Sequence, residues 1–176
     1  MLDNPSAVWE QLLREAVTSL RANDVVLANP EEIITGFART MWGAYAALVL
    51  LGTLSALFLA RWWQSLLEAP GGFGNEYREL RLGRALGVVA IVIIVAAALV
   101  EIELVDCLSW IAMSALAYQG LAAAHRRKAA QQMGQGGLVA IYVFLIVPLS
   151  AFVMVTLLAA WGVADNWRQF KGTAGA

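Results

Sequence analysis

The chain alternates long, largely uncharged apolar segments with short segments that carry the charges. Four apolar segments, at residues 40–60, 85–102, 107–124 and 137–162, are each about long enough to cross a bilayer. A segment in hydrocarbon must satisfy its backbone hydrogen bonds internally, so we expect each of them to be helical. The pattern predicts an all-α fold, a polytopic transmembrane helical bundle with four spans over residues 30–164.

Residues 1–29 form a different kind of element, an amphipathic helix followed by a linker. Asn4 is placed to cap this helix, with Pro5 at its first position. Apolar side chains recur at helical spacing on one face, at Trp9, Leu12, Leu13, Ala16, Val17 and Leu20. Such a helix either lies in the membrane interface or packs on the rest of the protein, and the sequence leaves both alternatives open.

A second helix start precedes the first span. Asn29, Pro30 and Glu32 match a cap, a first-position proline and the glutamate of a capping box. We expect this helix to run unbroken to about Trp63, a length of roughly 50 Å. Because the hydrocarbon core is only roughly 30 Å thick, the first turns are predicted to project from the membrane.

The boundaries between the later spans are less distinct. One helix over residues 85–124 would be roughly 60 Å long and would hold acidic residues in its middle. We therefore expect a hairpin at residues 101–106, although this segment contains neither glycine nor proline. Pro148 is expected to kink the fourth span, and residues 165–176 are expected to form a C-terminal tail.

Basic residues gather in the loops that follow the first and third spans, at Arg61, Arg78, Arg81, Arg84, Arg126, Arg127 and Lys128. The positive-inside rule predicts that both loops are cytoplasmic and that the acidic hairpin at residues 101–106 is outside. With four spans, both termini are then expected outside. An exported N-terminal segment indicates either that further spans precede this chain in a longer protein, which we favour, or that the segment crosses with the first helix.

Composition narrows the function classes. Charged residues make up 14% of the chain, against roughly 25% in an average soluble domain. The net charge of −1 gives no basic field to hold nucleic acid. The single cysteine and single histidine give neither an intrachain disulfide nor a metal cluster. Because no catalytic serine–histidine–aspartate set or HExxH motif is recognisable, we expect neither an enzyme nor a cofactor.

The third span carries the candidates for ligand binding. Asp106, Ser109 and Trp110 share a face by their spacing, as do Ser114, Tyr118 and Gln119. Polar groups at membrane depth are costly unless they pair or line a cavity. Two alternatives stay open, a solute-binding face that opens outward, or solvated acids at a helix end combined with hydrogen bonds between helices.

The first span and the loop after it hold the candidates for partner binding, which are Ala56, Ala60, Arg61, Trp62, Trp63, Gly71, Gly72, Arg78 and Arg81. Small residues at four-residue spacing let two helix backbones approach closely in lipid. The arginines are suited to docking a cytoplasmic partner. The alternatives are packing against the protein's own spans, and membrane anchoring by the tryptophans with arginines neutralised by Glu76 and Glu79.

The same loop carries a family resemblance. The stretches RWWQ at 61–64, PGGF at 70–73 and LRLGR at 80–84, with QGLA at 119–122 followed by His125, resemble the YybS-like family of bacterial membrane proteins. The resemblance implies a multi-pass protein of the inner membrane, with further spans upstream in most members. It also implies a distant similarity to the substrate-binding subunits of energy-coupling-factor transporters.

Two functions follow as expectations. On the resemblance, the chain is a membrane subunit that binds a small solute and works with coupling and ATPase subunits, with Ala56 and Ala60 facing the coupling subunit. The alternative is a scaffold or regulator that transports nothing and docks a cytoplasmic partner, or another membrane protein, through its arginine-rich loop. In either case membrane lipid is a partner and nucleic acid is not.

Overall fold

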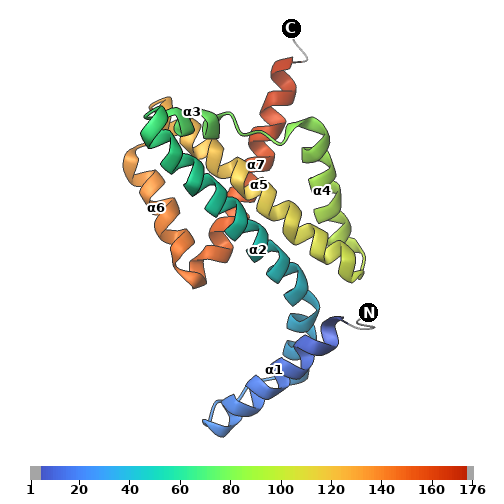
Figure 1. The fold of residues 1–176 in the computed structure, drawn as a ribbon. Coiled ribbons are helices and arrows are strands. Elements are labelled where there is room, and N and C mark those ends of the chain that lie inside the picture. Colours follow the sequence, from blue (N-terminus) through green and yellow to red (C-terminus); the bar gives the residue numbers. More distant parts are fainter. Residues whose placement is uncertain (1–4, 174–176) are drawn as a thin grey trace.

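The computed structural model describes residues 5–173, with side chains over residues 6–168, and this part of the chain is entirely α-helical. The described helices are α1 (Pro5–Ala22), α2 (Pro30–Glu68), α3 (Gly72–Arg78), α4 (Gly83–Leu99), α5 (Glu103–Ala129), α6 (Gln135–Ile146) and α7 (Pro148–Thr173). Helix α5 is central and packs against α2, α4 and α7 (Figure 1). The predicted all-α helical bundle is confirmed.

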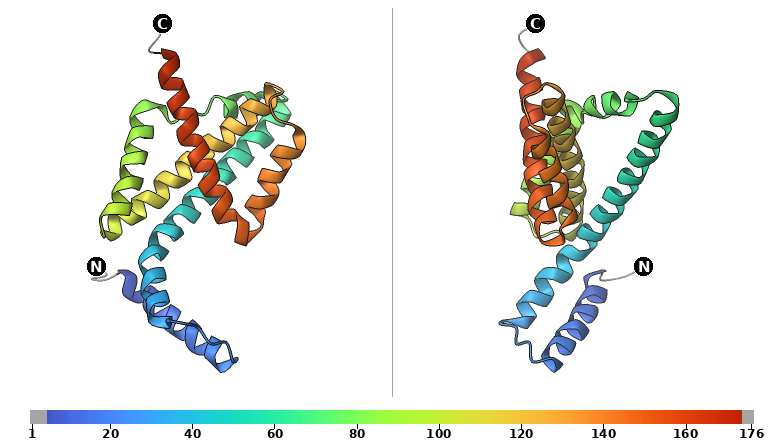
Figure 2. Two further views of the ribbon diagram at one scale, coloured as in Figure 1. Left: turned by 180° about the vertical axis from the view of Figure 1, so that it is seen from behind. Right: turned by 90° about the vertical axis from the view of Figure 1, so that its left-hand side faces the viewer.

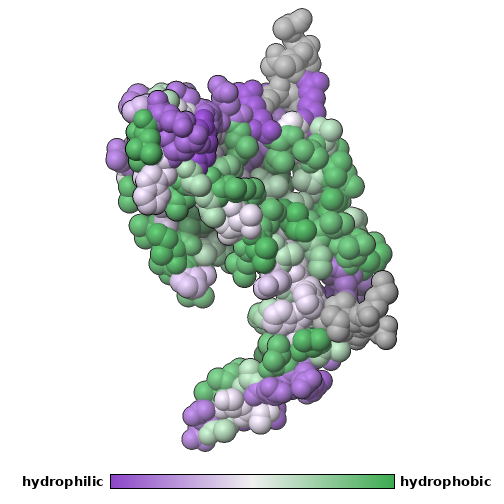
Figure 3. Space-filling model, in the orientation of Figure 1, coloured by the Kyte–Doolittle hydropathy of each residue, from purple (hydrophilic) through white to green (hydrophobic). Residues whose placement is uncertain are grey.

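The helices provide three or four candidate membrane spans. By length and hydropathy α2, α5 and α7 qualify alone, and α3 with α4 qualifies as a pair bent by 61°. Helix α6 has 12 residues and is roughly 18 Å long, which is shorter than the hydrocarbon core. Figure 3 shows mostly hydrophobic residues across the middle of the molecule and hydrophilic residues gathered at the end that holds α3. This distribution fits a multi-pass membrane protein.

Helix α2 runs unbroken for 39 residues, as predicted, and continues past Trp63 to Glu68. Asn29 precedes it with a φ of 52°. The predicted side-chain cap is wrong, because the Asn29 amide donates to the Glu32 carboxylate (3.4 Å) and makes no cap bond to the helix. The first turns of α2 extend beyond the bundle (Figure 2).

Helix α1 packs antiparallel along those first turns of α2. The rings of Trp9 and Trp42 meet edge to face at 5.9 Å, and Arg14 forms an ion pair with Glu31 (2.7 Å). Packing on the chain itself, one of the two alternatives for this amphipathic segment, is thus observed, and the position of the segment in the membrane interface stays a prediction. The predicted cap at Asn4 lies outside the described residues.

The hairpin between the second and third spans is confirmed. Helix α4 ends at Leu99 and α5 begins at Glu103. Val100 and Ile102 adopt extended backbone angles, which are open to any residue, so the chain turns here without glycine or proline.

The course predicted for the fourth span is wrong. Residues 137–162 do not form one kinked helix, because the chain folds back between α6 and α7 (Figure 1). Val147 is extended, with ψ 115°, as is usual before a proline, and Pro148 has no backbone N–H with which to continue α6. Helix α7 then runs parallel to α5, through residue 165 and on to Thr173, where a tail was expected.

The return of α7 also corrects the predicted placement of the C-terminus. Helix α7 ends at the same end of the bundle as the arginine-rich loop, whereas α1 lies at the opposite end (Figure 2). The two termini were expected on one side. The described N-terminal and C-terminal helices instead lie at opposite ends of the bundle, because α6 and α7 cross it as two antiparallel helices rather than one.

Candidate functional site

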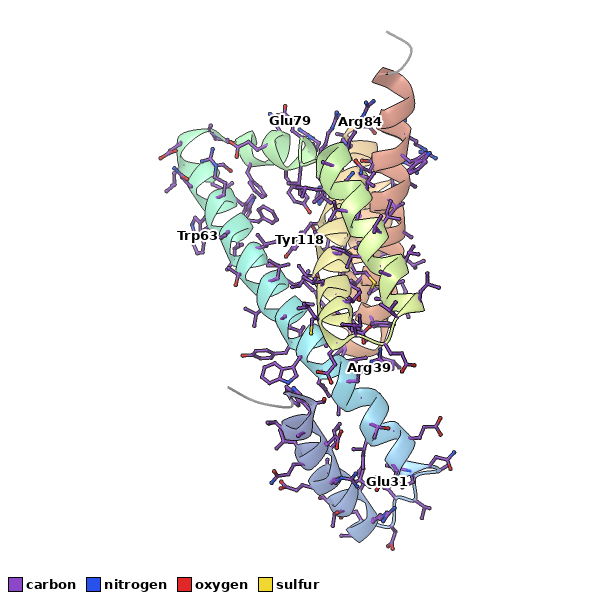
Figure 4. All side chains as sticks on the ribbon, turned by 90° about the vertical axis from the view of Figure 1, so that its right-hand side faces the viewer. Glu31, Arg39, Trp63, Glu79, Arg84 and Tyr118 are labelled. Carbon is purple, nitrogen blue, oxygen red and sulfur yellow. The ribbon has the colours of Figure 1, made fainter. Side chains whose placement is uncertain are left out.

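A cavity of about 520 Å³ lies between α2, α3, α5 and α6, toward the end of the bundle that holds the arginine-rich loop. Its lining residues are Ser55, Phe58, Leu59, Trp62, Ser65, Gly71, Phe73, Gly74, Tyr77, Tyr118, Leu121, His125 and Tyr142. In Figure 4, Tyr118 extends from α5 into the space between α5 and α2, beneath α3. Aromatic rings therefore dominate the walls.

The short helix α3 closes the polar end of this cavity. Gly71, with φ 85°, supplies the left-handed turn that starts α3, a conformation that favours glycine. Phe73 and Tyr77, four residues apart, then face the same way and stack at 5.8 Å. The Tyr77 ring also meets Phe58 (5.3 Å) and His125 (5.4 Å) edge to face. These rings join α3 to both α2 and α5.

The hydroxyl groups in the cavity are largely satisfied within the protein. The Tyr118 hydroxyl donates to the Leu51 carbonyl (2.6 Å), so Ser55, at 2.8 Å, donates to the Tyr118 oxygen. The Tyr77 hydroxyl donates to the Tyr118 carbonyl (3.4 Å). His125 Nε2 and the Tyr142 hydroxyl are hydrogen-bonded at 2.9 Å.

The cavity is lined by uncharged groups. None of the described lining residues is Asp, Glu, Lys or Arg. The nearest charges hold α3 from outside, where Arg61 donates two hydrogen bonds to Glu76, at 2.9 and 2.5 Å. These bonds lower the pKa of the exposed Glu76 carboxyl, which lies outside the apolar segments. The ion pair thus fixes α3 while leaving the cavity neutral.

A second polar cluster fixes the linker between α3 and α4. Arg126 pairs with Asp165 (2.5 Å) and donates to the backbone carbonyls of Arg78 (2.7 Å) and Leu80 (3.3 Å). The fully buried Gln119 accepts a hydrogen bond from the Leu82 amide (3.3 Å) and donates to Asp165 (3.4 Å). The cluster ties α5 and α7 to the linker behind the cavity.

The structure separates the six residues predicted to bind a ligand. At the opposite end of α5, Asp106 pairs with Arg39 (2.7 Å) and Trp110 packs on Phe152 (5.8 Å). Ser109, Ser114 and Gln119 are engaged in hydrogen bonds within the bundle. Only Tyr118 of the six lines the cavity. The residues do not form the single outward-opening face that was one of the alternatives, because α5 turns them toward different partners, such as Arg39 of α2 for Asp106 and Asp165 of α7 for Gln119.

Sequence reasoning missed most of the residues that build the cavity. The missed side chains are Phe58, Phe73, Tyr77 and Tyr142, and His125 was treated only as part of a family stretch. A signal was present, since Phe73 and Tyr77 are spaced to share a helix face. Tyr142 gave no such signal, because its own spacing does not show which helix α6 lies beside.

The residues predicted to bind a partner have mixed surroundings. Trp62 and Gly71 line the cavity, Arg61 is paired with Glu76, and the Arg78 guanidinium lies against Asn75. The remaining exposed ones are Ala56, Ala60, Trp63 and Arg81. Trp63 is 64% exposed and points away from the bundle (Figure 4). The open part of this surface is therefore the outer face of α2, together with Arg81.

Gly72 begins α3 and its Cβ position would lie 3.4 Å from the Ala69 side chain. Gly52, one turn before Ala56, has nothing within 4 Å of the position that a Cβ would occupy. The small-residue face of α2 is thus not used for packing among the described residues.

No group of three or more His, Cys, Asp and Glu side chains that could hold a metal ion occurs within residues 5–173. Comparison of the chain with protein-family models, with curated proteins and with solved structures finds no match. The YybS-like resemblance therefore stays a prediction.

Proposed function

We propose that this chain is an integral membrane protein that binds one small, uncharged molecule in the aromatic cavity beneath α3. The observation that carries the proposal is the cavity itself, about 520 Å³ in volume. Small-molecule sites typically measure roughly 300–1,000 Å³ and combine apolar and aromatic walls with a few placed polar groups. The cavity has this composition, with Tyr118, His125 and Tyr142 as its polar groups.

The proposal includes a role as the solute-binding membrane subunit of a transporter. The support is that one wall of the cavity is the short helix α3, which is held by side-chain contacts. If these contacts break, α3 can move away without the unfolding of a span. Coupling and ATPase subunits are the partners that this role requires. Ala56 and Ala60, on the open face of α2, are the residues proposed to meet a coupling subunit.

The test is gentle purification from native membranes, followed by mass spectrometry of the small molecules that stay bound. Gly74 lines the cavity and has open space at its Cβ position, so Gly74→Trp fills the site. Gly36, on the extended start of α2, also has open space, and Gly36→Trp is the matched control. We expect one molecule to co-purify with the wild type and with Gly36→Trp but not with Gly74→Trp. Equal recovery from all three proteins, or none from the wild type, would reject the proposal.

A second candidate, a scaffold that docks another protein, is favoured by the open face of α2 and by the exposed Arg81. Arg81→Glu is expected to remove a partner bound through the loop, whereas Arg21→Glu, at the end of α1, is expected to retain it. Partners that are the same for both variants and the wild type would exclude loop docking.

A further inference from the structure

One side of the cavity, between α2 and α6, is not closed by a contact between helices. Its polar end is covered by α3, and α5 forms its back wall. Helices α2 and α6 flank it without packing against each other in the described structure, and Figure 2 shows α2 leaning away from the bundle. Ser55, Phe58, Tyr118 and Tyr142 all lie within the apolar segments. The gap between α2 and α6 therefore reaches into the apolar segments, while the end of the cavity at α3 and His125 lies beyond them.

One hydrogen-bond donor of the His125–Tyr142 pair, which lines the cavity, is left over. A neutral imidazole and a phenol together carry two polar hydrogens, and only one of them lies between His125 Nε2 and the Tyr142 oxygen. Whichever group donates, the other keeps one N–H or O–H. No acceptor among the described residues takes this second hydrogen. The hydroxyl hydrogens of Tyr77 and Tyr118 are already used by backbone carbonyls.

We infer that the cavity takes a membrane-dissolved molecule that enters between α2 and α6, lays an uncharged apolar or ring-shaped body against the aromatic walls, and presents one oxygen acceptor to the His125–Tyr142 pair. This inference rests on the proposed function and narrows its ligand class. A charged ligand is excluded by the lining, since an ion at this depth without a counter-charge is strongly unfavourable. A ligand with an oxygen acceptor is favoured, because it satisfies the remaining donor of the His125–Tyr142 pair.

The test uses the full chain in lipid nanodiscs with decylubiquinone, whose ring carbonyls are acceptors and whose alkyl chain keeps it in the bilayer. Quinones quench tryptophan fluorescence, and Trp62 lines the cavity. Binding appears as saturable quenching that Trp62→Phe removes, above the linear quenching of unbound probe. Decylbenzene, which lacks an acceptor, is tested as a competitor.

We expect decylbenzene to bind the cavity about five- to tenfold more weakly than decylubiquinone, which is the range that one net hydrogen bond contributes. His125→Phe and Tyr142→Phe each leave one donor, so each single variant should keep most of the affinity for decylubiquinone. The double variant leaves none and should lose the preference for the acceptor. Tyr45→Phe, on the exposed face of α2 outside the cavity, is the control. Because the single variants are conservative, they test the donor count even where the double variant does not fold.

Four outcomes bear on the inference. The inference is supported by saturable quenching in which each single variant keeps most of its affinity for decylubiquinone and only the double variant loses the preference for the acceptor. Equal competition by decylbenzene and the quinone overturns the acceptor claim. Saturation by 2-naphthol added from water, with none by decylubiquinone, overturns entry from the membrane. In both of these cases the cavity still binds a ligand and the proposed function stands. If neither probe saturates, the ligand class is wrong, and mass spectrometry of Gly74→Trp against the wild type judges the proposed function separately.

Discussion

Helix α5 is packed in opposite ways on its two flanks. Against α7, glycines remove the side chains from the contact, and a Cβ on Gly120 or Gly162 would collide with the backbone of Leu158 or Leu116. Beside Tyr118, where α2 and α6 flank α5, large rings line a cavity of about 520 Å³, although α2 approaches the α5 backbone closely farther along, at Gly43. The comparison shows that one flank of α5 is a close backbone seam, whereas the other leaves space beside the helix.

The reason for the difference is the driving force for packing in lipid. Apolar side chains gain little by leaving hydrocarbon for one another, so tight helix association depends on close backbone approach by small residues. The seam between α5 and α7 has that approach. The α2 flank lacks it at the cavity, where rings and hydrogen bonds such as Tyr118 to Leu51 hold the helices at a distance. Mutations on the two flanks should therefore have different consequences.

The largest effect is a matter of topology. The seam requires α7 to run in the same direction as α5 and to end beside the arginine-rich loop. A single fourth span would instead place the end of the chain and the arginine-rich loop on opposite sides of the membrane. In a Cys107→Ser background, Gly72→Cys and Gly172→Cys should react with a membrane-impermeant thiol reagent only from the cytoplasmic side, and Glu103→Cys only from the other. Labelling of Gly172→Cys from the side of Glu103→Cys would break the comparison.

A bulky residue in the seam comes next. Gly162→Leu is expected to destabilise the protein by at least about 3 kcal/mol, because its side chain must displace the backbone of α5. Gly52→Leu places the same side chain in open space on α2 and is expected to change stability by less than about 1 kcal/mol. Thermal unfolding in detergent measures both. Similar losses would show that α2 is packed more tightly than the structure indicates.

The polar cluster behind the cavity should have a smaller effect. Arg126→Met removes the ion pair between Arg126 and the partly buried Asp165 and the hydrogen bonds to the carbonyls of the α3–α4 linker, so we expect a loss of about 2 kcal/mol. Arg126→Met with Asp165→Leu should recover part of this loss, because both charges are then removed. Arg14→Met, at an exposed ion pair, should cost at most about 1 kcal/mol. A double variant less stable than Arg126→Met would contradict this account.

The smallest effect concerns the helix that closes the cavity. Arg61 lowers the pKa of Glu76 in the folded protein, so this pair stabilises the fold above the ordinary pKa of a glutamate and stops doing so as the pH falls through the lowered value. Glu76→Gln should remove this pH dependence and loosen α3. Hydrogen exchange of the α3 amides between pH 7 and pH 4 measures it, with Glu79→Gln on the same loop as the control. Unchanged α3 exchange in Glu76→Gln would show that the rings alone hold the helix.

Sequence reasoning reached the elements more readily than the site. Helix α2 was predicted from the proline at position 30 and the long apolar run that follows it. The division between α4 and α5 was predicted from the acidic residues of the hairpin. These signals depend on the length and the solvation of a segment. The cavity could not be predicted in this way. Its rings come from α2, α3, α5 and α6, and neither Tyr118 nor Tyr142 indicates by its own spacing that the other helix lies nearby.

The sequence by itself determined that this protein is a helical membrane protein with its basic residues at particular loops, because hydrocarbon demands long uncharged helices and every residue contributes to that signal locally. The tertiary structure alone decided the path of α7, the seam at Gly120 and Gly162, and the cavity beneath α3. The physical reason is that a proline permits either a kink or a full reversal, and only the packing available to the returning helix selects between them. The glycines of α5 and α7 provide that packing.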